Sequence, residues 1–342
     1  MRKFIVKTVA VLSPFILLYM IVPYFYSVDQ GDLFRIGYFH REDAYRAQFV
    51  NEMNQPIAYT DISSIDTCAK LEYSVLLIGD SFTEWRGFSF HNYMAMDDSI
   101  SVLYYDMVVD NTIETLYALI NGDFFDKVSI DYVILQSVER SFSTRANLNP
   151  ESMISMKDMI QTVKKKPDRF NKNIPLDNSI VKYFAINAFR PFKKGCMVGV
   201  YQFESTKPVF SSKHEDRILV FEMDIYELPK NSDTSAVLKL NNTLNHLSAL
   251  VAEKGSSLIV LPAPDKYSVY YDYIKDRDQY PQPVFFDILK PLEKQYIYID
   301  SDEILKNAVS LGTDDVYFAD DTHWSPVGAK IIADAIQSKM KK

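Results

Sequence analysis

The feature that most constrains the fold is an apolar run at residues 75–78, Val-Leu-Leu-Ile, which ends at Gly79. An uninterrupted apolar run of this length, bounded by glycine, is typical of a strand that is buried on both faces. Two similar runs lie at residues 132–135 and 257–261. Because segments with helical spacing separate these runs, the sequence predicts an α/β fold, a three-layer sandwich with a central parallel sheet.

The remaining elements of this sandwich are predicted from the spacing of apolar residues. Further strands are expected at residues 101–106, 218–222 and 296–299, and helices at residues 111–121, 234–254, 283–295, 301–310 and 327–339. Gly122 and Gly255 stand where two of these helices should end. The stretch at residues 141–216 breaks the alternation, so we expect it to be an insertion or cap over the strand ends.

The N-terminus predicts a membrane segment. Arg2, Lys3 and Lys7 precede residues 8–26, which carry no charge. This run is roughly the length that crosses a bilayer as a helix, and basic residues before such a helix stay in the cytoplasm. We therefore expect one N-terminal transmembrane helix in a bacterial-type cytoplasmic membrane, with the remainder of the chain in the periplasm or extracellular space. A cleaved signal peptide is the alternative, but no small-x-small cleavage site follows the run.

These features divide the chain into three parts. Residues 1–26 are the expected membrane anchor or uncleaved signal. Residues 27–70 are polar and mixed, without a helix or strand period, and are expected to link the membrane to the domain and wrap its surface. Residues 71–342 are the expected α/β domain, with its insertion at about residues 141–216.

Composition and charge exclude several classes of function. The 342 residues are 47% hydrophobic and 24% charged, as in folded proteins. The net charge of −8 argues against nucleic-acid binding, which needs a basic surface. Only Cys68 and Cys196 are present, which excludes a metal cluster built on cysteine; they could form one disulfide or remain two buried thiols. We expect neither a metal nor a cofactor.

Ser81 is the candidate nucleophile. It follows Gly79 and Asp80 at the end of the first apolar run. Glycine permits a tight strand-to-helix turn, and a helix beginning near Ser81 would direct its N–H groups and dipole at a developing oxyanion. These are the needs of a nucleophilic serine. The tripeptide alone is weak evidence, because aspartate and serine are also ordinary helix caps.

His323 is the candidate base. It follows Asp320 and Asp321 on a predicted loop near the C-terminus. A carboxylate that accepts from the imidazole Nδ1–H would fix the tautomer and leave Nε2 facing Ser81. Either aspartate could serve from its position in the sequence. The remaining histidines lack such neighbours and are expected to be structural or surface residues: His40, His91, His214 and His246.

Four segments together carry a family resemblance. Gly-Asp-Ser-Phe at residues 79–82 with Asp-x-x-His at residues 320–323 resembles the SGNH (GDSL-like) hydrolase superfamily. The finer similarity is to its AlgX/AlgJ-like branch. It rests on Asp-Thr-His-Trp-Ser-Pro-Val-Gly-Ala at residues 321–329, Val-Glu-Arg-Ser-Phe at residues 138–142, and Leu-Pro-Ala-Pro-Asp-Lys-Tyr-Ser-Val-Tyr at residues 261–270.

The resemblance implies O-acetylation of exopolysaccharides at the cell envelope. The AlgX/AlgJ-like motif makes Asp321 the acid of the triad, whereas the general SGNH motif makes it Asp320; we favour Asp321. In that branch the Asp-x-His motif precedes the serine. Here Ser81 comes first, as in ordinary SGNH hydrolases.

The oxyanion donors are predicted from position. The glycine and asparagine blocks that usually supply them in SGNH hydrolases are not evident. The Ser81 N–H and a side chain such as Gln136 or Arg140, which follow the strand at residues 132–135, are candidates. For Arg140 a structural ion pair is an equally good interpretation. Lys266 and Trp324 are further candidates for contact with the oxyanion or the substrate.

Three functions remain open on this basis. The first is a serine-dependent O-acetyltransferase that acts on an envelope or extracellular polysaccharide through an acyl-serine. The family resemblance implies that a polytopic membrane acyltransferase supplies the acyl donor. The second is an SGNH esterase that removes acyl groups from a glycan. The third is a non-catalytic assembly protein that has kept the fold.

Overall fold

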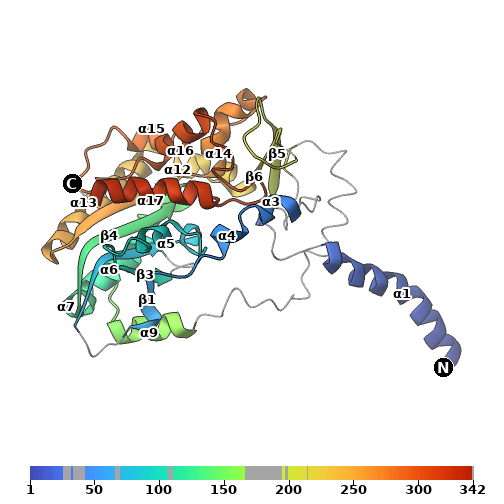
Figure 1. Ribbon diagram of the computed structural model, residues 1–342, viewed down its shortest axis with the longest axis horizontal. Helices are drawn as coiled ribbons and strands as arrows, with labels where there is room; N and C mark the ends of the chain where they lie inside the picture. The colour runs from blue at the N-terminus through green and yellow to red at the C-terminus, as the bar shows by residue number, and fades with distance from the viewer. Residues whose placement is uncertain are drawn as a thin grey trace.

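The computed structural model of the protein describes eight segments of the chain: residues 1–25, 32–33, 43–65, 70–106, 111–165, 195–196, 199–213 and 215–340. In these segments six strands form a parallel sheet. Figure 1 shows helices on both sides of this sheet. The α/β fold with a central parallel sheet, predicted from the sequence, is therefore confirmed. This fold positions the candidate site, because the carboxyl ends of parallel strands meet at one edge of the sheet.

The strand order is β1-β3-β2-β4-β7-β8, and all neighbours are parallel. The strands are β1 (Thr60–Asp61), β2 (Leu71–Gly79), β3 (Val102–Asp106), β4 (Val128–Val138), β7 (Ser257–Ala263) and β8 (Ile297–Tyr298). Ile78 on β2 pairs with Leu135 on β4, and Gln136 on β4 pairs with Leu261 on β7. This register brings the residues that follow Gly79 beside Gln136.

Two hydrophobic cores cover the two faces of the sheet. Leu76 and Ile78 belong to one core, and Val75 and Leu77 belong to the other, because successive side chains of a strand point to opposite faces. The first core includes α6 (Thr112–Asn121), α13 (Thr234–Glu253) and α15 (Phe285–Leu289); the second includes α5 (Phe90–Ala95), α14 (Lys266–Tyr270), α16 (Ser301–Ser310) and α17 (Pro326–Met340). The continuous apolar runs are thus explained by burial on both sides.

Helix ends follow local sequence signals. The Asn111 side chain accepts from the N–H of Ile113 at the start of α6, and Gly255 adopts a positive φ of 83° just after α13. The helix expected at residues 283–295 is shorter, since only α15 forms there. Pro291 explains the difference, because proline lacks the N–H that would continue the helix.

The strand expected at residues 218–222 forms, but in a different sheet. It is β6 (Arg217–Phe221), which pairs antiparallel with β5 (Val200–Glu204) in a separate two-stranded ribbon. Ile218 and Val220 face the second core, while Leu219 packs with Leu33. Both faces of the ribbon are therefore apolar, which makes its sequence look like that of a central strand.

The expected insertion is described in part. Its first helices are α8 (Glu139–Arg145) and α9 (Met156–Lys165), and α9 packs into the first core. The Met156 N–H donates to Asp123, which lies just before β4, at the amino end of that strand. Residues 205–213 lie on the opposite side, against the loop that carries His323. Residues 166–194 lie outside the described residues, and the cap stays a prediction.

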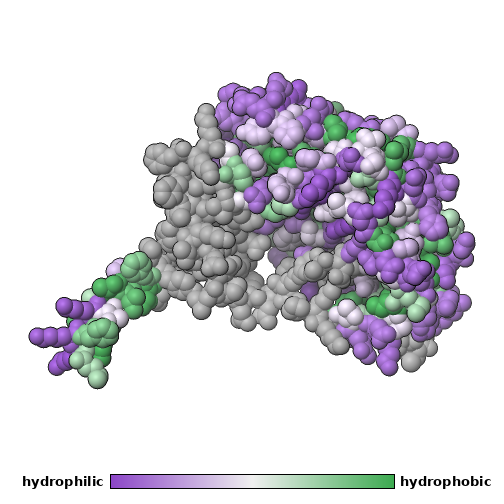
Figure 2. All heavy atoms as spheres, turned by 180° about the vertical axis from the view of Figure 1, so that it is seen from behind, coloured by the Kyte–Doolittle hydropathy of each residue, from purple (hydrophilic) through white to green (hydrophobic). Residues whose placement is uncertain are grey.

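The N-terminal helix α1 (Arg2–Phe25) stands apart from the sheet and its helices in Figure 1. The side chains described for it are mostly exposed and apolar between Phe4 and Leu17, and Figure 2 shows apolar residues on the face of the helix that is in view. Among the described residues, no helix has both the length and the apolarity needed to cross a membrane.

Short helices connect the main elements. They are α3 (Asp43–Ala47), α4 (Val50–Met53), α7 (Phe124–Lys127), α11 (Glu222–Tyr226), α12 (Leu228–Asn231) and the 3-10 turns η1 (Ile62–Ser64), η2 (Ser81–Thr83), η4 (Tyr271–Tyr273) and η5 (Arg277–Gln279). Two of them bear on the candidate site. Helix α3 packs against the loop that carries His323, and η2 carries Ser81.

Candidate active site

Ser81 lies on a single 3-10 turn directly after β2. The helix expected to begin near Ser81 does not form, because η2 spans only three residues and closes with a bond from the Thr83 N–H to the Asp80 carbonyl. A turn this short has little macrodipole. The expectation that a helix dipole would stabilise a developing oxyanion at Ser81 was therefore wrong. A Cβ on Gly79 would lie 2.3 Å from Thr83 Cγ2 and 2.7 Å from Gln136 Oε1. Glycine is required here for this close approach.

Asp80 holds the turn that carries Ser81 through hydrogen bonds to its side chain. Its buried carboxylate accepts from the N–H of Phe82 at 3.3 Å and from the N–H of Val138 at 2.7 Å, and it pairs with Arg145 at 2.7 Å. Burial would raise the pKa of Asp80, but Arg145 and these N–H donors outweigh it and lower the pKa. The carboxylate thus stays ionised and ties the end of β2 to the end of β4.

His323 joins Ser81 to Asp321. The distance from His323 Nε2 to Ser81 Oγ is 2.9 Å, and Nδ1 lies 2.6 Å from Asp321 Oδ1. The backbone N–H of His323 also donates to Asp321 Oδ1 at 3.0 Å. Asp321 is fully buried, and the His323 side chain is 12% exposed. This is the hydrogen-bonded order that a Ser–His–Asp mechanism requires.

The charges at this site stabilise a protonated imidazole. Burial opposes ionisation of Asp321, but His323 and Arg46 outweigh it and hold the pKa of Asp321 below its ordinary value. Burial would also lower the pKa of His323, but the adjacent Asp321 carboxylate outweighs it and raises that pKa. A histidine in this setting readily accepts a proton from a neighbouring hydroxyl.

Asp320, the alternative acid, points elsewhere. Arg46 donates to it from Nε at 3.0 Å and from Nη2 at 2.7 Å. No hydrogen bond joins Asp320 to His323 among the described residues, whereas Asp321 makes two. The structure therefore brings Ser81, His323 and Asp321 together and leaves Asp320 in an ion pair.

Gln136 lies at the end of β4, beside the turn. Its Oε1 accepts from the Asp80 N–H at 2.8 Å, and its buried Nε2 lacks a partner in the described part of the chain. The Ser81 N–H likewise makes no hydrogen bond to any described residue. The Ser81 N–H and the Gln136 Nε2–H are therefore both able to donate to an oxyanion, as the sequence predicts for them.

Arg140 forms the structural ion pair that the sequence left open. It donates from Nη1 to Asp265 at 2.5 Å and to Asp224 at 3.1 Å. The buried Glu139 accepts from the Asp265 N–H at 2.9 Å. Desolvation by burial raises the pKa of Glu139 well above its ordinary value. Arg140 balances these acids, and the contacts do not direct it at Ser81.

Lys266 and Trp324 hold the loop of His323, which differs from the expected contact with substrate. Lys266 is fully buried and donates to the carbonyls of Phe318, Ala319 and Asp321 at 2.6, 3.0 and 3.2 Å. Three N–H donors are thereby used, and none is left for an oxyanion. Burial lowers the pKa of Lys266 to about 8.

The Trp324 ring is a core residue. It is 3% exposed and packs on Phe82, and its indole N–H donates to Tyr317 Oη at 2.9 Å. A ring enclosed in this way has no free face for a sugar. Phe82 and Trp85 are the aromatic residues that lie beside His323, at 4.9 and 5.8 Å between ring centroids.

Two residues of the site were not found from the sequence. Asp32 and Arg46 belong to the stretch at residues 27–70, where no periodic pattern or motif marked them. The Asp32 N–H donates to Asp321 Oδ2 at 3.2 Å, and Arg46 Nη2 donates to the same oxygen at 3.3 Å. Contacts so distant along the chain leave no signal in a local pattern.

Asp32, Asp321 and His323 also satisfy the spacing of a possible metal site, with ligand atoms within 4.8 Å of one another. The separation of 2.6 Å between His323 Nδ1 and Asp321 Oδ1 is that of a hydrogen bond. Two ligands of one tetrahedral zinc ion lie farther apart, at about 3 Å or more. The arrangement therefore fits a proton relay better than a metal centre.

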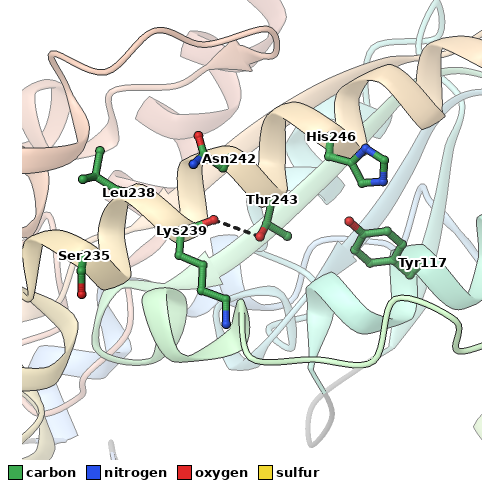
Figure 3. Close-up of a pocket in the computed structure, with 7 residues that line it drawn as sticks. All are labelled: Tyr117, Ser235, Leu238, Lys239, Asn242, Thr243 and His246. Carbon is green, nitrogen blue, oxygen red and sulfur yellow. Dashed lines mark hydrogen bonds between the residues drawn. The ribbon is translucent and has the colours of Figure 1, made fainter.

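The other histidines and the cysteine that the structure describes make contacts with groups other than Ser81. His91 is fully buried, and burial lowers its pKa to about 3; it stacks on Tyr104. His246 lies on α13 beside Tyr117, at a cavity of about 530 Å³ shown in Figure 3. His40, His214 and Cys68 lie outside the described residues. Cys196 donates to Glu222 at 3.4 Å. Because Cys68 is outside the described residues, pairing of the two cysteines stays untested.

Comparison with known protein families gives one match. Residues 224–342 match the family described as SGNH hydrolase-like domain, acetyltransferase AlgX. The matched range includes Lys266, Asp321 and His323 but not Ser81. No curated protein matches the chain. No solved structure matches it either.

Proposed function

We propose that the protein is a serine-dependent O-acyltransferase of a polysaccharide, because residues 224–342 match the family described as SGNH hydrolase-like domain, acetyltransferase AlgX. The observation that carries this proposal is the chain of hydrogen bonds from Ser81 through His323 to Asp321. The matched residues include His323 and Asp321. Ser81 lies outside the matched range, on the turn that follows β2.

The first step of the proposed reaction forms an acyl-serine. Ser81 Oγ attacks the carbonyl carbon of a donor ester while His323 Nε2 takes the hydroxyl proton. Asp321 stabilises the imidazolium, and the Ser81 N–H with Gln136 Nε2 stabilises the oxyanion. The C–O bond to the donor then breaks, and His323 returns the proton to the leaving oxygen.

The second step transfers the acyl group. A sugar hydroxyl gives its proton to His323 Nε2 and attacks the acyl-serine carbonyl. The bond to Ser81 Oγ breaks, and His323 returns the proton to that oxygen. The products are an O-acylated sugar and free Ser81. If water takes the place of the sugar, the same groups perform ester hydrolysis.

Acyl transfer is tested with the detergent-solubilised full chain and a p-nitrophenyl acetate donor. Ser81→Ala is expected to abolish ester turnover, and a glycan acceptor is expected to gain acetyl groups in the wild type. Acetate release that no acceptor diverts would identify an esterase instead. If Ser81→Ala hydrolyses the ester as fast as the wild type, Ser81 is not the nucleophile, and the non-catalytic assembly role is the function that remains.

From the uncharged run at residues 8–26, we also propose that the N-terminal segment at residues 1–26 is a single membrane anchor and that the domain lies outside the cytoplasm. The apolar residues exposed on α1 support the anchor. The orientation is supported by the basic residues at the start of α1, which are Arg2, Lys3 and Lys7. Membrane fractionation with and without residues 1–25 tests the anchor. Recovery of the full chain in the soluble fraction would contradict it.

The acyl donor would then come from the membrane. An acyl group made in the cytoplasm needs a polytopic acyltransferase to carry it across, so such a protein is the proposed partner. Co-purification of a polytopic protein with the detergent-solubilised full chain tests this, and acyl transfer by the purified chain without that protein and with a cytoplasmic thioester would contradict it.

A further inference from the structure

The carboxylate of Asp321 is satisfied from two directions. Within the described residues it accepts four hydrogen bonds, two of them from His323. The other two come from far upstream in the chain, from the Asp32 N–H at 3.2 Å and Arg46 Nη2 at 3.3 Å. We call the described residues 32–33 and 43–53 the strap. Half of the hydrogen bonds to the candidate acid therefore come from the strap.

The Asp32 side chain binds the loop that carries His323. Its carboxylate accepts from the Thr322 N–H at 2.9 Å and from Thr322 Oγ1 at 2.6 Å. The nearer oxygen lies 3.9 Å from His323 Nδ1. Asp32 thus holds the residue between Asp321 and His323 and places a second negative charge near the imidazole.

Arg46 is held in place by several contacts. Its guanidinium lies 3.7 Å from the centre of the Phe318 ring and pairs with Asp320 at 2.7 Å. The arginine side chain is 11% exposed. A guanidinium this enclosed is a fixed donor, and removing it would leave the buried Asp321 carboxylate short of a partner.

The strap is anchored by packing on both sides of these polar contacts. Leu33 is fully buried against Leu219 of the ribbon. Phe49 packs edge-on against Phe318 at 5.5 Å, and Tyr45 Oη accepts from the Ala319 N–H at 2.7 Å. The strap therefore has apolar contacts that fix the position of its polar groups.

We propose that the strap completes the catalytic centre, with Arg46 and Asp32 as positioning residues that hold Asp321 and Thr322 so that His323 presents Nε2 to Ser81. This inference rests on the proposed function for the roles of Ser81 and His323. The domain core supplies the reacting groups, and the strap supplies the contacts that orient the acid. Lys266 holds the carbonyls of the same loop independently.

The two positioning residues carry opposite charges, which gives opposite effects on His323. The groups that act on its imidazole are Asp321 and Asp32, which favour the charged form, and Arg140, which opposes it; Ser81 is neutral. Asp32→Asn removes a negative charge, so the pKa of His323 should fall. Arg46→Met removes a positive charge bound to Asp321, so the pKa of His323 should rise.

The test uses the detergent-solubilised full chain and ester turnover as a function of pH. Arg46→Met is expected to lower kcat by about tenfold with little change in KM, as is common when an orienting group is removed. Arg46→Lys should recover part of the loss. The acidic limb of kcat/KM should move by about 0.5 to 1 pH unit, downward in Asp32→Asn and upward in Arg46→Met.

Arg277→Met is the matched control. Arg277 is an exposed arginine that pairs with Asp272 on a surface turn, and its loss should leave kcat and the pH profile unchanged. Wild-type kcat and pH profiles in both folded strap variants would overturn the proposal, because a strap that only packs would not move either value.

A second measurement does not depend on turnover. The chain has five histidines, so the imidazole signals can be followed by NMR and His323 assigned with His323→Ala. The opposite shifts in the pKa of His323 are expected even if ester turnover fails and the proposed function with it. An unchanged His323 titration in both variants would overturn the strap inference by itself.

Discussion

At the scale of single residues, the state of His323 sets the reactivity of Ser81. A general base must be neutral to accept a proton. Asp321 raises the pKa of His323 above its ordinary value of 6.5 despite burial. Activity should therefore rise with pH through a midpoint above 6.5, where the imidazolium loses its proton.

Asp321→Asn supplies the matching variant. It removes the charge that favours the imidazolium, so the midpoint of kcat/KM should move to lower pH while kcat falls. Asp320→Asn should change both values less, because Asp320 pairs with Arg46 and not with His323. A larger effect of Asp320→Asn than of Asp321→Asn would contradict the assignment of the acid.

Lys266 has a different importance, which is to shape the loop. Lys266→Met would leave three carbonyls of residues 318–321 without their donor, and we expect a loss of stability of about 1–3 kcal/mol together with a lower kcat. Lys294 is a matched control, because it also donates to three carbonyls, those of Leu289, Lys290 and Leu292. Lys294→Met should lower thermal stability but not kcat. Equal kcat losses in both variants would show that Lys266 acts only through stability.

At the scale of elements, the strands were predictable because their signal is local. Burial on both faces makes β2, β4 and β7 continuous apolar runs, and helical spacing with caps marks α6, α13, α16 and α17. The pattern could not show that β6 joins a separate ribbon, since pairing partners are chosen in three dimensions. It also could not show that η2 is one turn, because Gly-Asp-Ser starts a longer helix equally well.

The turn after β2 gives the prediction that belongs to this scale. Gly79→Ala would press a methyl group against Thr83 and Gln136, and we expect it to lower stability by about 1–3 kcal/mol and to reduce Ser81 reactivity. Thr83→Ser removes the closer methyl, Thr83 Cγ2 at 2.3 Å. The double variant should therefore recover part of both losses in thermal unfolding and in labelling by a fluorophosphonate. Losses that simply add would contradict the clash.

At the scale of the whole molecule, the site is assembled from parts that lie far apart in the chain. Ser81 and His323 are separated by 242 residues, and Asp32 and Asp321 by 289. The motifs around Ser81 and His323 could be found because each has a recognisable sequence. The strap could not, because its importance depends on where the chain returns after folding. The same reason hid which acids pair with Arg140, as well as the carbonyl contacts of Lys266.

The strap also limits how far the site can lie from the proposed anchor. Helix α1 ends at Phe25, and Asp32 follows after seven residues. Seven residues span at most about 25 Å, so the site at Asp321 must lie near the end of α1. If α1 is in the membrane, as we propose, Ser81 works close to the bilayer surface, where a membrane partner could deliver the acyl donor.

Lengthening this connection separates the two roles of the chain. A flexible insertion of about 20 Gly and Ser residues after residue 26 would let the domain move away from the membrane. We expect acyl transfer to glycan in membranes that contain the partner to fall, while turnover of a soluble ester by the detergent-solubilised chain stays at the wild-type level. An insertion of equal length after Gly312, on a surface turn, serves as the control and should change neither value. Equal glycan acylation by the lengthened chain and the wild type would mean that the partner does not need the site to be near the bilayer.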